Sequence, residues 1–333
     1  MKPELEIVAE VAQGFEGCAK QAAMMVRAAA SAGADTVKFQ LVYADELATP
    51  DYAYYELFKG LEMPDADWEN LAALAQVKGL RLDLDVFGPR SLDLAVRLGA
   101  AIKLHGTDTS NIGFLKEVRA RSPKKVILGA GGAQADEIDA ALEILGDLQI
   151  VVMLGFQAYP TPGTDNQIAR VGTLVERYKA RDNIIIGFGD HAQPEEGFAL
   201  PFSAAALGAG ARVIEKHITL GRGMEIEDFE SALNPDEFKD YADAVRATDA
   251  ALGEPLNQPD FGMSDSERSY RSMIRRHVVA RMDLPAGTVL SPDMIELKRT
   301  SAESPIFDVK DVYERTLSQD AKQGSPILAG MLQ

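Results

Sequence analysis

The sequence predicts an α/β fold, a (β/α)8 barrel followed by a small, mostly β domain. Short β-branched runs alternate with Ala- and Leu-rich stretches of helical period. Eight such units fill roughly 250 residues, the usual size of a (β/α)8 barrel. After residue 253 the chain becomes polar and the alternation stops. An open, doubly wound sheet shows the same alternation and is the alternative, but the count of eight favours closure.

Each unit starts with an apolar run typical of a buried strand and continues into a helical stretch. The first run, LEIVAEVA, is followed by AKQAAMMVRAAASAG, which ends as a helix at Gly33. The predicted strands are 5–12, 35–40, 80–87, 100–106, 124–131, 148–156, 183–191 and 211–220. The predicted helices are 19–33, 66–79, 89–98, 111–120, 134–145, 166–180, 195–208 and 235–252.

Domain boundaries follow from the change in composition. We expect the barrel in residues 1–254, a polar linker with Gly and Pro in 255–272, and the small domain in 273–333. A domain of this size has a marginal core, so docking onto the barrel or onto a second chain would help to stabilise it.

Composition narrows the classes of function. The net charge of −17 and the pI near 4.7 argue against binding to nucleic acid or to an anionic membrane surface. Cys18 is the single cysteine, so no disulfide can form within the chain. The segment MKPELEIVAE lacks the pattern of a signal or transit peptide, and no apolar run reaches the ~20 residues that span a bilayer. We therefore expect a cytoplasmic protein.

Ionisable residues gather where the predicted strands end. In a (β/α)8 barrel the carboxyl ends of the strands form the active-site face, and such groups are costly in a core unless they are paired or hydrated. We therefore expect them to form one polar pocket. They are Glu10, Lys38, Gln40, Asp83, Asp85, Lys103, His105, Asp108, the 129–132 loop, Gln157, Asp190, His191, Glu215, Lys216 and His217.

Two histidines are the sharpest signal for a metal. His191 and His217 end neighbouring strands, one strand–helix unit apart. Two imidazoles with oxygen ligands suit Mn²⁺, Fe²⁺, Co²⁺ or Zn²⁺. The alternative is a pair of histidines bonded to the backbone. His105 also ends a strand but has no matching partner, and His277 is expected to be structural.

Three lysines lie in or at the ends of apolar strands: Lys38, Lys103 and Lys216. A buried ammonium is costly, so each is expected to have a role. One role for such a lysine is to bind phosphate or carboxylate, and another is to act as the nucleophile in Schiff-base catalysis. The alternative to both is an ion pair with a strand-end acid such as Glu10 or Glu215. The glycine-rich turn in LGAGGAQADEID precedes a helix and is a weak signal for an anion site.

Several of these segments resemble the sialic acid (N-acetylneuraminate) synthase family. They are VAEVAQGFEG, AGADTVKFQ, AYPTPGTDNQ, IGFGDHA, ALGAGARVIEKHITL and ALNPDEFKDY. The tail VVARMDLPAGTVLSPDMIELKRT resembles that family's C-terminal SAF domain (antifreeze-like, β-clip). The resemblance covers nearly the whole chain in order, and it implies a TIM barrel followed by a SAF domain.

The resemblance implies a reaction and a metal. Phosphoenolpyruvate would condense with an open-chain amino sugar, N-acetylmannosamine-like, to give a sialic-acid-like 2-keto acid and phosphate for polysaccharide synthesis, as in a spore coat. A divalent metal, most often Mn²⁺, would bind His191 and His217 and polarise the sugar aldehyde. Glu10, Lys38 and Asp228 match the catalytic positions of the family.

The resemblance also assigns substrate binding and an assembly. Two chains would form a homodimer in which each SAF domain covers the other chain's barrel, and Arg299 would contact the sugar. The matched substrate-binding positions are Lys103, Lys124, Thr107, Gly129, Gly131, Gly132, Gln157, Asp190, Lys216 and Arg299.

The sequence departs from the family at several of these positions. The family's Ser-Thr-Gly-Met phosphate loop is Gly129-Ala130-Gly131-Gly132 here, which removes two hydroxyl donors. A hydrogen bond to a charged group contributes about 1.5–3 kcal/mol, so the losses could change the substrate. Two alternatives stay open: a sugar-binding homologue with an altered donor site, and a Schiff-base aldolase. The other departures are Gly14, Phe15, Gln157, Gly189, Ala192, Thr300 and Ser301.

Overall fold

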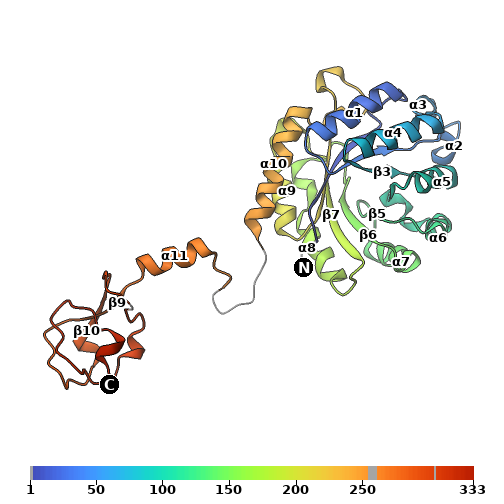
Figure 1. Cartoon of the computed structure of the whole chain (residues 1–333). Coiled ribbons are helices and arrows are strands. Elements are labelled where there is room, and N and C mark those ends of the chain that lie inside the picture. The colour runs from blue at the N-terminus through green and yellow to red at the C-terminus, as the bar shows by residue number, and fades with distance from the viewer. Residues whose placement is uncertain (1–2, 254–260, 304) are drawn as a thin grey trace. The chain divides into compact units, whose positions relative to one another are not determined.

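The computed structural model describes residues 3–253, 261–303 and 305–333. The chain forms two compact units, Met1–Gly253 and Glu254–Gln333 (Figure 1).

The first unit is a closed barrel of eight parallel strands in chain order, in which β8 pairs with β1. The predicted barrel is therefore confirmed, and the open sheet is wrong. Each strand is shorter than the predicted run: β1 and β2 lose only their first residue, whereas the last predicted residues of the other strands lie in the loops at the mouth. The strands are β1 (Glu6–Ala12), β2 (Thr36–Gln40), β3 (Arg81–Asp85), β4 (Ala101–Leu104), β5 (Val126–Gly129), β6 (Ile150–Gly155), β7 (Ile184–Asp190) and β8 (Val213–His217).

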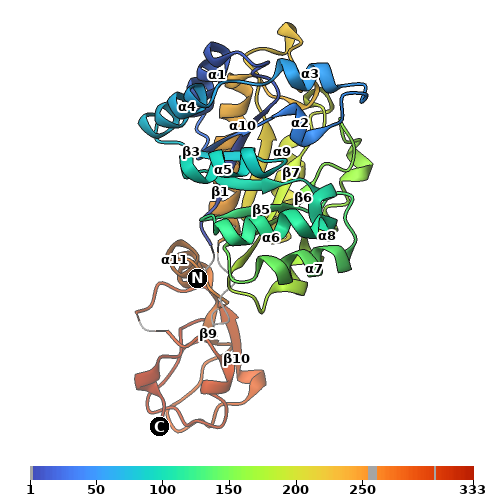
Figure 2. The same ribbon diagram turned by 90° about the vertical axis from the view of Figure 1, so that its right-hand side faces the viewer.

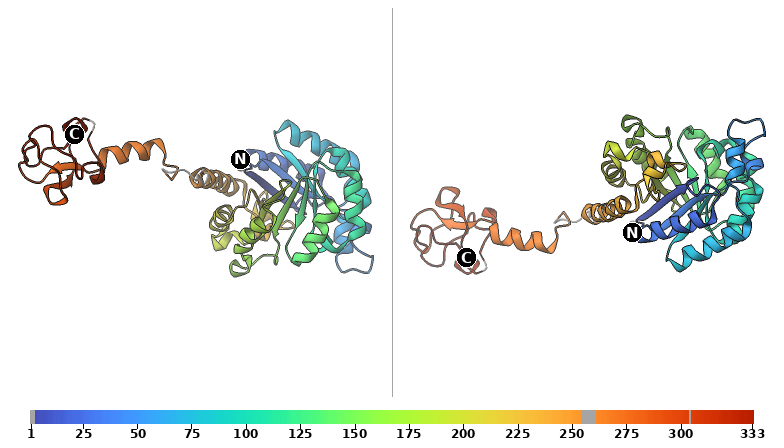
Figure 3. Two further views of the ribbon diagram at one scale, coloured as in Figure 1. Left: turned by 90° about the horizontal axis from the view of Figure 1, so that it is seen from below. Right: turned by 90° about the horizontal axis from the view of Figure 1, so that it is seen from above.

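Helices surround the strands on the outside (Figures 2 and 3). Two short helices, α2 and α3, form in the Tyr- and acid-rich connection after β2, where the sequence pattern predicts no helix. The bounds are α1 (Ala19–Ser31), α2 (Ala44–Leu47), α3 (Tyr55–Gly60), α4 (Asp65–Val77), α5 (Pro89–Leu98), α6 (Ile112–Arg121), α7 (Ala135–Leu145), α8 (Ala169–Tyr178), α9 (Ala199–Gly208) and α10 (Pro235–Leu252).

The alternation of side chains along each strand divides the barrel into an outer and an inner core. Outward residues such as Ile7 and Phe39 pack against the helices. Inward residues fill the barrel in layers. The middle layer is apolar and comprises Val8, Ile127, Val151, Met153 and Val213, with Ile185 packed against it.

A charged layer closes the amino-terminal end of the barrel. Lys125 Nζ lies 2.9 Å from Glu6 Oε1 and 3.3 Å from Asp83 Oδ2. Asp83 therefore belongs to the opposite end of β3 from the mouth, which corrects its predicted place among the strand-end acids. Burial raises the pKa of Asp83 to about 6, partly offset by the Lys125 ammonium.

The second unit contains the antiparallel strands β9 (His277–Ala280) and β10 (Ile295–Lys298) around a small apolar core. The predicted linker, 255–272, differs from the structure in part. Helix α11 (Asp265–Ile274) occupies its end, begins after Ser264 and has no buried residue. Ser264 Oγ accepts a hydrogen bond from Glu267 N at 3.1 Å and so caps the amino-terminal end of α11. The sequence shows no hydrophobic periodicity here from which this helix could be predicted. The rest of that segment, up to residue 260, lies outside the described residues.

Within these described residues, no helix carries an apolar stretch long enough to cross a bilayer.

An aromatic cluster lies between the barrel and its helices. Phe15, one of the positions at which the sequence departs from the family, is fully buried. Its ring centroid lies 5.9 Å from that of Phe39 and 5.5 Å from that of Trp68, both edge-on. This substitution therefore serves packing of the outer core.

Phe15→Ala should lower the free energy of unfolding of the first unit by about 3–5 kcal/mol, because it opens a cavity in this cluster. Trp68 is the only tryptophan, so its fluorescence reports urea unfolding of this unit. Val77→Ala, at a side chain that is 81% exposed, should change the free energy by less than about 0.5 kcal/mol. Equal effects of the two substitutions would contradict the packing role.

Candidate active site

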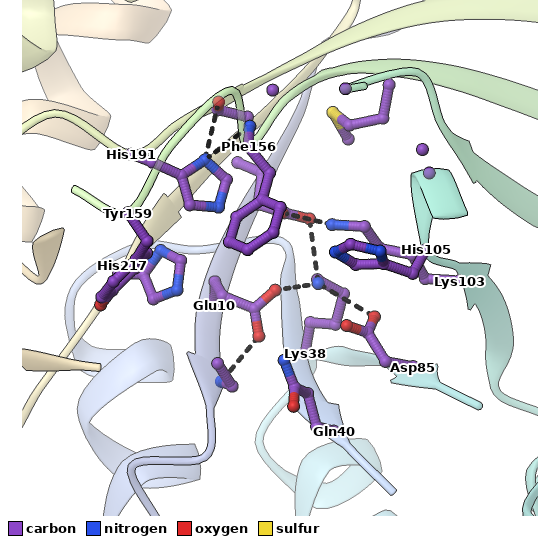
Figure 4. A pocket seen from close by; sticks show the side chains of 18 of the residues that line it. Glu10, Lys38, Gln40, Asp85, Lys103, His105, Phe156, Tyr159, His191 and His217 are labelled. Carbon is purple, nitrogen blue, oxygen red and sulfur yellow. Dashed lines mark hydrogen bonds and ion pairs between the residues drawn. The ribbon is translucent and has the colours of Figure 1, made fainter. Parts of the chain in front are cut away.

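The inward residues at the carboxyl ends of the strands differ between the two halves of the barrel. Strands β8 and β1–β4 contribute charged or imidazole side chains, whereas β5, β6 and β7 contribute glycine. The glycines leave space, and a cavity opens above the apolar layer (Figure 4). Its walls include Glu10, Lys38, Asp85, Lys103, Glu215, His217, Gly129, Gly155 and Gly189.

A buried ion cluster lies at the base of this cavity. Lys38 Nζ contacts Glu10 Oε2, and it lies 3.1 Å from Asp85 Oδ1 and 3.4 Å from Glu215 Oε2. Burial lowers the pKa of Lys38, and the carboxylates of Asp85 and Glu215 oppose that shift. The ammonium is therefore fixed in place by acids from three other strands, which is the ion pairing weighed above.

A second lysine lies beside this cluster. Lys103 Nζ donates to Glu215 Oε1 at 2.8 Å. Burial alone would lower the pKa of Lys103, but the charges of Glu215 and Asp85 outweigh it and raise that pKa. Burial would raise the pKa of Glu215, but Lys103 and Lys38 lower it to about 2. Lys103 thus stays an ammonium, which suits anion binding and disfavours its use as a Schiff-base nucleophile.

The two predicted metal ligands converge. The ring centroids of His191 and His217 are 5.0 Å apart, and both rings line the cavity (Figure 4). His191 follows β7, and its carbonyl accepts from Ser231 Oγ at 2.7 Å, which fixes the loop that carries it. His217 ends β8 and faces inward in register with Glu10.

The electrostatics of this pair suit a metal. Burial lowers the pKa of His191 to about 3 and that of His217 well below its usual value, so both imidazoles are neutral at pH 7. His191 Nδ1 lies 3.1 Å from Gly189 O and 3.2 Å from Phe156 N. Phe156 N–H donates to Nδ1, so metal binding through Nε2 would require the other tautomer, in which Nδ1–H points to Gly189 O and the Phe156 contact is given up.

Two residues therefore fit a divalent cation, and no group of three or more candidate ligands occurs among the described residues. His217 Nδ1 is buried and has no partner among those same residues. A metal at this pair would need its remaining ligands from substrate or water, one more than in the usual catalytic zinc site, which has three protein ligands.

Asp228 reaches the cavity from the segment after β8. Its Oδ2 accepts from Gln13 N at 2.8 Å, which holds it against the loop after β1. Burial raises the pKa of Asp228 to about 6, so its carboxyl can exchange a proton near neutral pH.

Two aromatic residues of the wall were not among the predicted site residues. Tyr159 lies 5.8 Å from His217 between ring centroids, and its buried hydroxyl has no partner within the described part of the chain. Phe156 lies 5.3 Å from His191 and has a left-handed backbone, with φ of 59°. Both follow β6 in the stretch that contains AYPTPGT, and proximity to a strand end was the only signal.

Three of the predicted substrate-binding residues point elsewhere. Lys124 precedes β5 at the amino-terminal end, next to Lys125, so its predicted place at the mouth is wrong. Asp190 and Lys216 alternate with the inward residues Gly189 and Glu215, so they face outward. Lys216 Nζ lies 3.2 Å from Asp190 Oδ2 and 2.7 Å from Ala192 O, which makes a buried ion pair behind the wall.

The remaining predicted residues divide between the wall and its surroundings. Gly129 and Gly131 line the cavity. Thr107 and Gly132 are exposed beside it, and Gln157 Nε2 donates to Asn166 O at 3.0 Å away from the wall. Arg299 lies in the second unit, where its Nε donates to Ile274 O at 3.0 Å, and its contact with sugar stays a prediction.

Comparison with known proteins connects this site to a family. Residues 25–257 match the NeuB family, and residues 275–333 match the SAF domain. The chain belongs to the NeuB family. The SAF match agrees with the small antiparallel unit, so both parts of the predicted resemblance are confirmed.

Similar proteins include N,N'-diacetyllegionaminic acid synthase of Legionella pneumophila, which is 26% identical over 97% of this chain and 93% of that protein. The spore coat polysaccharide biosynthesis protein SpsE of Bacillus subtilis is 30% identical over 88% of this chain and 83% of that protein. The crystal structure of N-acetylneuraminic acid synthetase from Leptospira borgpetersenii superposes with a TM-score of 0.72 at 25% identity, covering 81% of this chain and 92% of that one.

The outward ion pair generates a prediction about stability and binding. Lys216→Met alone should cost about 3–5 kcal/mol of unfolding free energy, because the buried Asp190 carboxylate loses its partner. Adding Asp190→Asn should restore most of that loss. The double variant should bind phosphoenolpyruvate as wild type does in calorimetry, and lost binding in a stable double variant would place the pair in the site after all.

The burial of His191 generates a prediction about pH. The folded-state pKa of His191, about 3, is below its usual 6.5, so the unfolded state binds more protons between these values. Metal-free wild type should lose stability relative to His191→Gln as pH falls below 6.5, by at most about 1.4 kcal/mol per pH unit. Urea unfolding at pH 7.5, 6 and 5 in chelator measures the difference. Parallel curves would show that His191 is not buried as a neutral ring.

Proposed function

We propose that this NeuB-family protein condenses phosphoenolpyruvate with an open-chain amino sugar to give a nonulosonic 2-keto acid and phosphate. The observation that carries the proposal is the pair of neutral imidazoles, His191 and His217, on one cavity with Lys38 and Lys103. The names of the relatives support it, since they include synthases of legionaminic, pseudaminic and sialic acids. A place in polysaccharide biosynthesis is supported by the relative SpsE.

The charge of the cavity supports a metal requirement. Its described walls carry four carboxyl groups, Glu10, Asp85, Glu215 and Asp228, but only two ammonium groups, those of Lys38 and Lys103. Such a site repels an anion with several charges. A divalent cation on His191 and His217, most suitably Mn²⁺, would offset this charge and polarise the acceptor's carbonyl.

The chain's own residues would position the donor. Lys103 and Lys38 offer the positive charge for the carboxylate and phosphate of phosphoenolpyruvate. Glu215 and Asp85 hold both ammonium groups in a fixed arrangement, so little rotamer freedom is lost on binding. The aromatic rings of Phe156 and Tyr159 flank the imidazole pair and would contact the acceptor sugar.

The proposed bond changes balance with one water molecule. A bond forms between C3 of phosphoenolpyruvate and the aldehyde carbon, whose oxygen takes up a proton. Water adds at C2, the bond from C2 to the phosphate-bearing oxygen breaks as inorganic phosphate leaves, and the added oxygen becomes the ketone oxygen at C2. The carboxyl of Asp228, with its pKa near 6, would accept the proton that the water gives up.

The assembly is a further part of the proposal. We propose a homodimer in which the SAF domain of one chain covers the barrel of the other and Arg299 contacts the sugar. The high exposure of Tyr270 and Met273 on α11 supports a partner for that helix. A cytoplasmic location stays a prediction.

The test is phosphate release from phosphoenolpyruvate with Mn²⁺ and a panel of amino sugars that includes N-acetylmannosamine and a 2,4-diacetamido-2,4,6-trideoxyhexose. Wild type should release phosphate only when both metal and acceptor are present. His191→Gln and His217→Gln should each weaken Mn²⁺ binding in calorimetry by more than about 100-fold, because losing a ligand costs more than losing a residue that only hydrogen-bonds to a ligand. His277→Gln, in the second unit, is the matched control and should bind Mn²⁺ as wild type does.

Three outcomes would contradict the proposal. Absence of both phosphoenolpyruvate binding and phosphate release, for every acceptor, would favour the sugar-binding homologue with an altered donor site. A mass increase after borohydride reduction with pyruvate would favour the Schiff-base aldolase. Equal Mn²⁺ binding by wild type and both site variants would remove the metal site.

A further inference from the structure

The glycine half of the cavity forms a continuous wall of backbone, which we call the glycine wall: Gly106, Gly129, Gly131, Gly155 and Gly189. A side-chain carbon on Gly106 would lie 2.2 Å from Gly131 O, one on Gly131 would lie 1.9 Å from Gly155 O, and one on Gly155 would lie 2.5 Å from Gly189 O. No side chain fits at these positions without moving the neighbouring strand end. At Gly129, where the family has serine, a side-chain carbon would lie 2.7 Å from Gly106 N, so that hydroxyl cannot be restored in place.

One side chain beside this wall offers a replacement donor. His105 immediately precedes Gly106, and its ring lines the same cavity (Figure 4). Its ring centroid lies 4.9 Å from that of Phe156, edge-on, so Phe156 fixes one side of the imidazole. Lys103, two residues earlier on the same strand, also lines the cavity.

The hydrogen bonds of His105 determine where its proton lies. Thr107 N lies 3.4 Å from His105 Nδ1, and Thr107 Oγ1 lies 2.9 Å from the same atom. A backbone N–H can only donate, so Nδ1 accepts and the proton of the neutral ring is on Nε2. Burial lowers the pKa of His105, which keeps the ring neutral at pH 7. The exposed Thr107 therefore acts as a positioning residue for the imidazole.

His105 is separate from the two predicted metal ligands. The Phe156 ring lies between them, 4.9 Å from His105 and 5.3 Å from His191 between centroids. The Nδ1 lone pair of His105 is used by Thr107, and its Nε2 carries a proton, so neither nitrogen is available to a cation. The role weighed from the sequence, metal ligation, is thus replaced by that of an N–H donor.

We propose that His105 Nε2–H, together with the Lys103 ammonium, binds the phosphate group of the donor substrate against the glycine wall. This assignment rests on the proposed function and deepens it, because it names a side-chain donor that takes over from the missing hydroxyls. Because the glycine wall has no side chains, the phosphate can approach its backbone closely and fill the space that side chains would otherwise occupy. A neutral imidazole adds a donor without adding charge next to Lys103.

The test compares two replacements of His105 with opposite hydrogen-bonding capacity. His105→Phe keeps an aromatic ring against Phe156 but removes the donor, whereas His105→Gln loses the ring but keeps an N–H. Loss of a hydrogen bond to a charged group corresponds to about a 10- to 100-fold change. His105→Phe should therefore raise the KM for phosphoenolpyruvate by that factor, with the KM for the acceptor sugar unchanged. His105→Gln should recover most of the difference.

Binding of inorganic phosphate and of phosphoenolpyruvate in calorimetry, with Mn²⁺ present, gives a readout that does not need turnover. Weaker binding by His105→Phe than by His105→Gln supports the assignment. Wild-type turnover with equal KM values in all three proteins overturns the role of His105 alone. Failure of wild type to bind phosphoenolpyruvate would overturn the proposed function, and this assignment with it.

Discussion

The two-residue alternation of side chains in a closed ring of parallel strands is the constraint on which the site depends. It places Glu10, Lys38, Lys103, Glu215 and His217 inside the barrel mouth and sends the residues between them into the outer core. On β5, β6 and β7 the same inward positions are glycine, so the charged half faces an open half. The cavity exists because the inward positions in one half of the ring have no side chains. The apolar layer of Val8, Ile127 and Val151 forms the floor of the cavity.

Burying so many ionisable groups is tolerable only because their charges are paired or absent. Lys38 and Lys103 share Glu215, Asp85 pairs with Lys38, and the low pKa of Glu215 is a consequence of the two ammonium groups beside it. The imidazoles of His191 and His217 have no such ion-pair partner and are neutral, so they are the uncharged nitrogen ligands that the mouth offers to a metal. The arrangement separates an ionic side, suited to the donor anion, from an imidazole and aromatic side suited to a carbonyl acceptor, with Phe156 between them.

The sequence predicted the barrel because each strand is buried on both faces and reads as a compact apolar run followed by a helix. It also predicted the convergence of His191 and His217, since both end neighbouring strands. It could not assign which of two adjacent residues faces the inside of the barrel. Lys216 and Asp190 each lie next to an inward-facing residue on the strand, so they face outward, behind the wall. The resemblance assigned Lys124 to substrate binding, but Lys124 precedes β5 and therefore lies at the amino-terminal end of the barrel, opposite the mouth. Phe156 and Tyr159 come from a loop whose backbone, left-handed at Phe156, has no periodic signal.

The account stands on a cation shared by two imidazoles at one edge of the mouth and a phosphate seated at the glycine wall opposite. A crystal structure of the full chain with Mn²⁺ and phosphoenolpyruvate, with anomalous scattering data for the metal, tests both positions at once. The account predicts an anomalous peak bonded to His191 and His217, and the phosphate beside Lys103 and the glycine wall. A metal peak elsewhere, or bound phosphoenolpyruvate with both imidazoles free of metal, would contradict it.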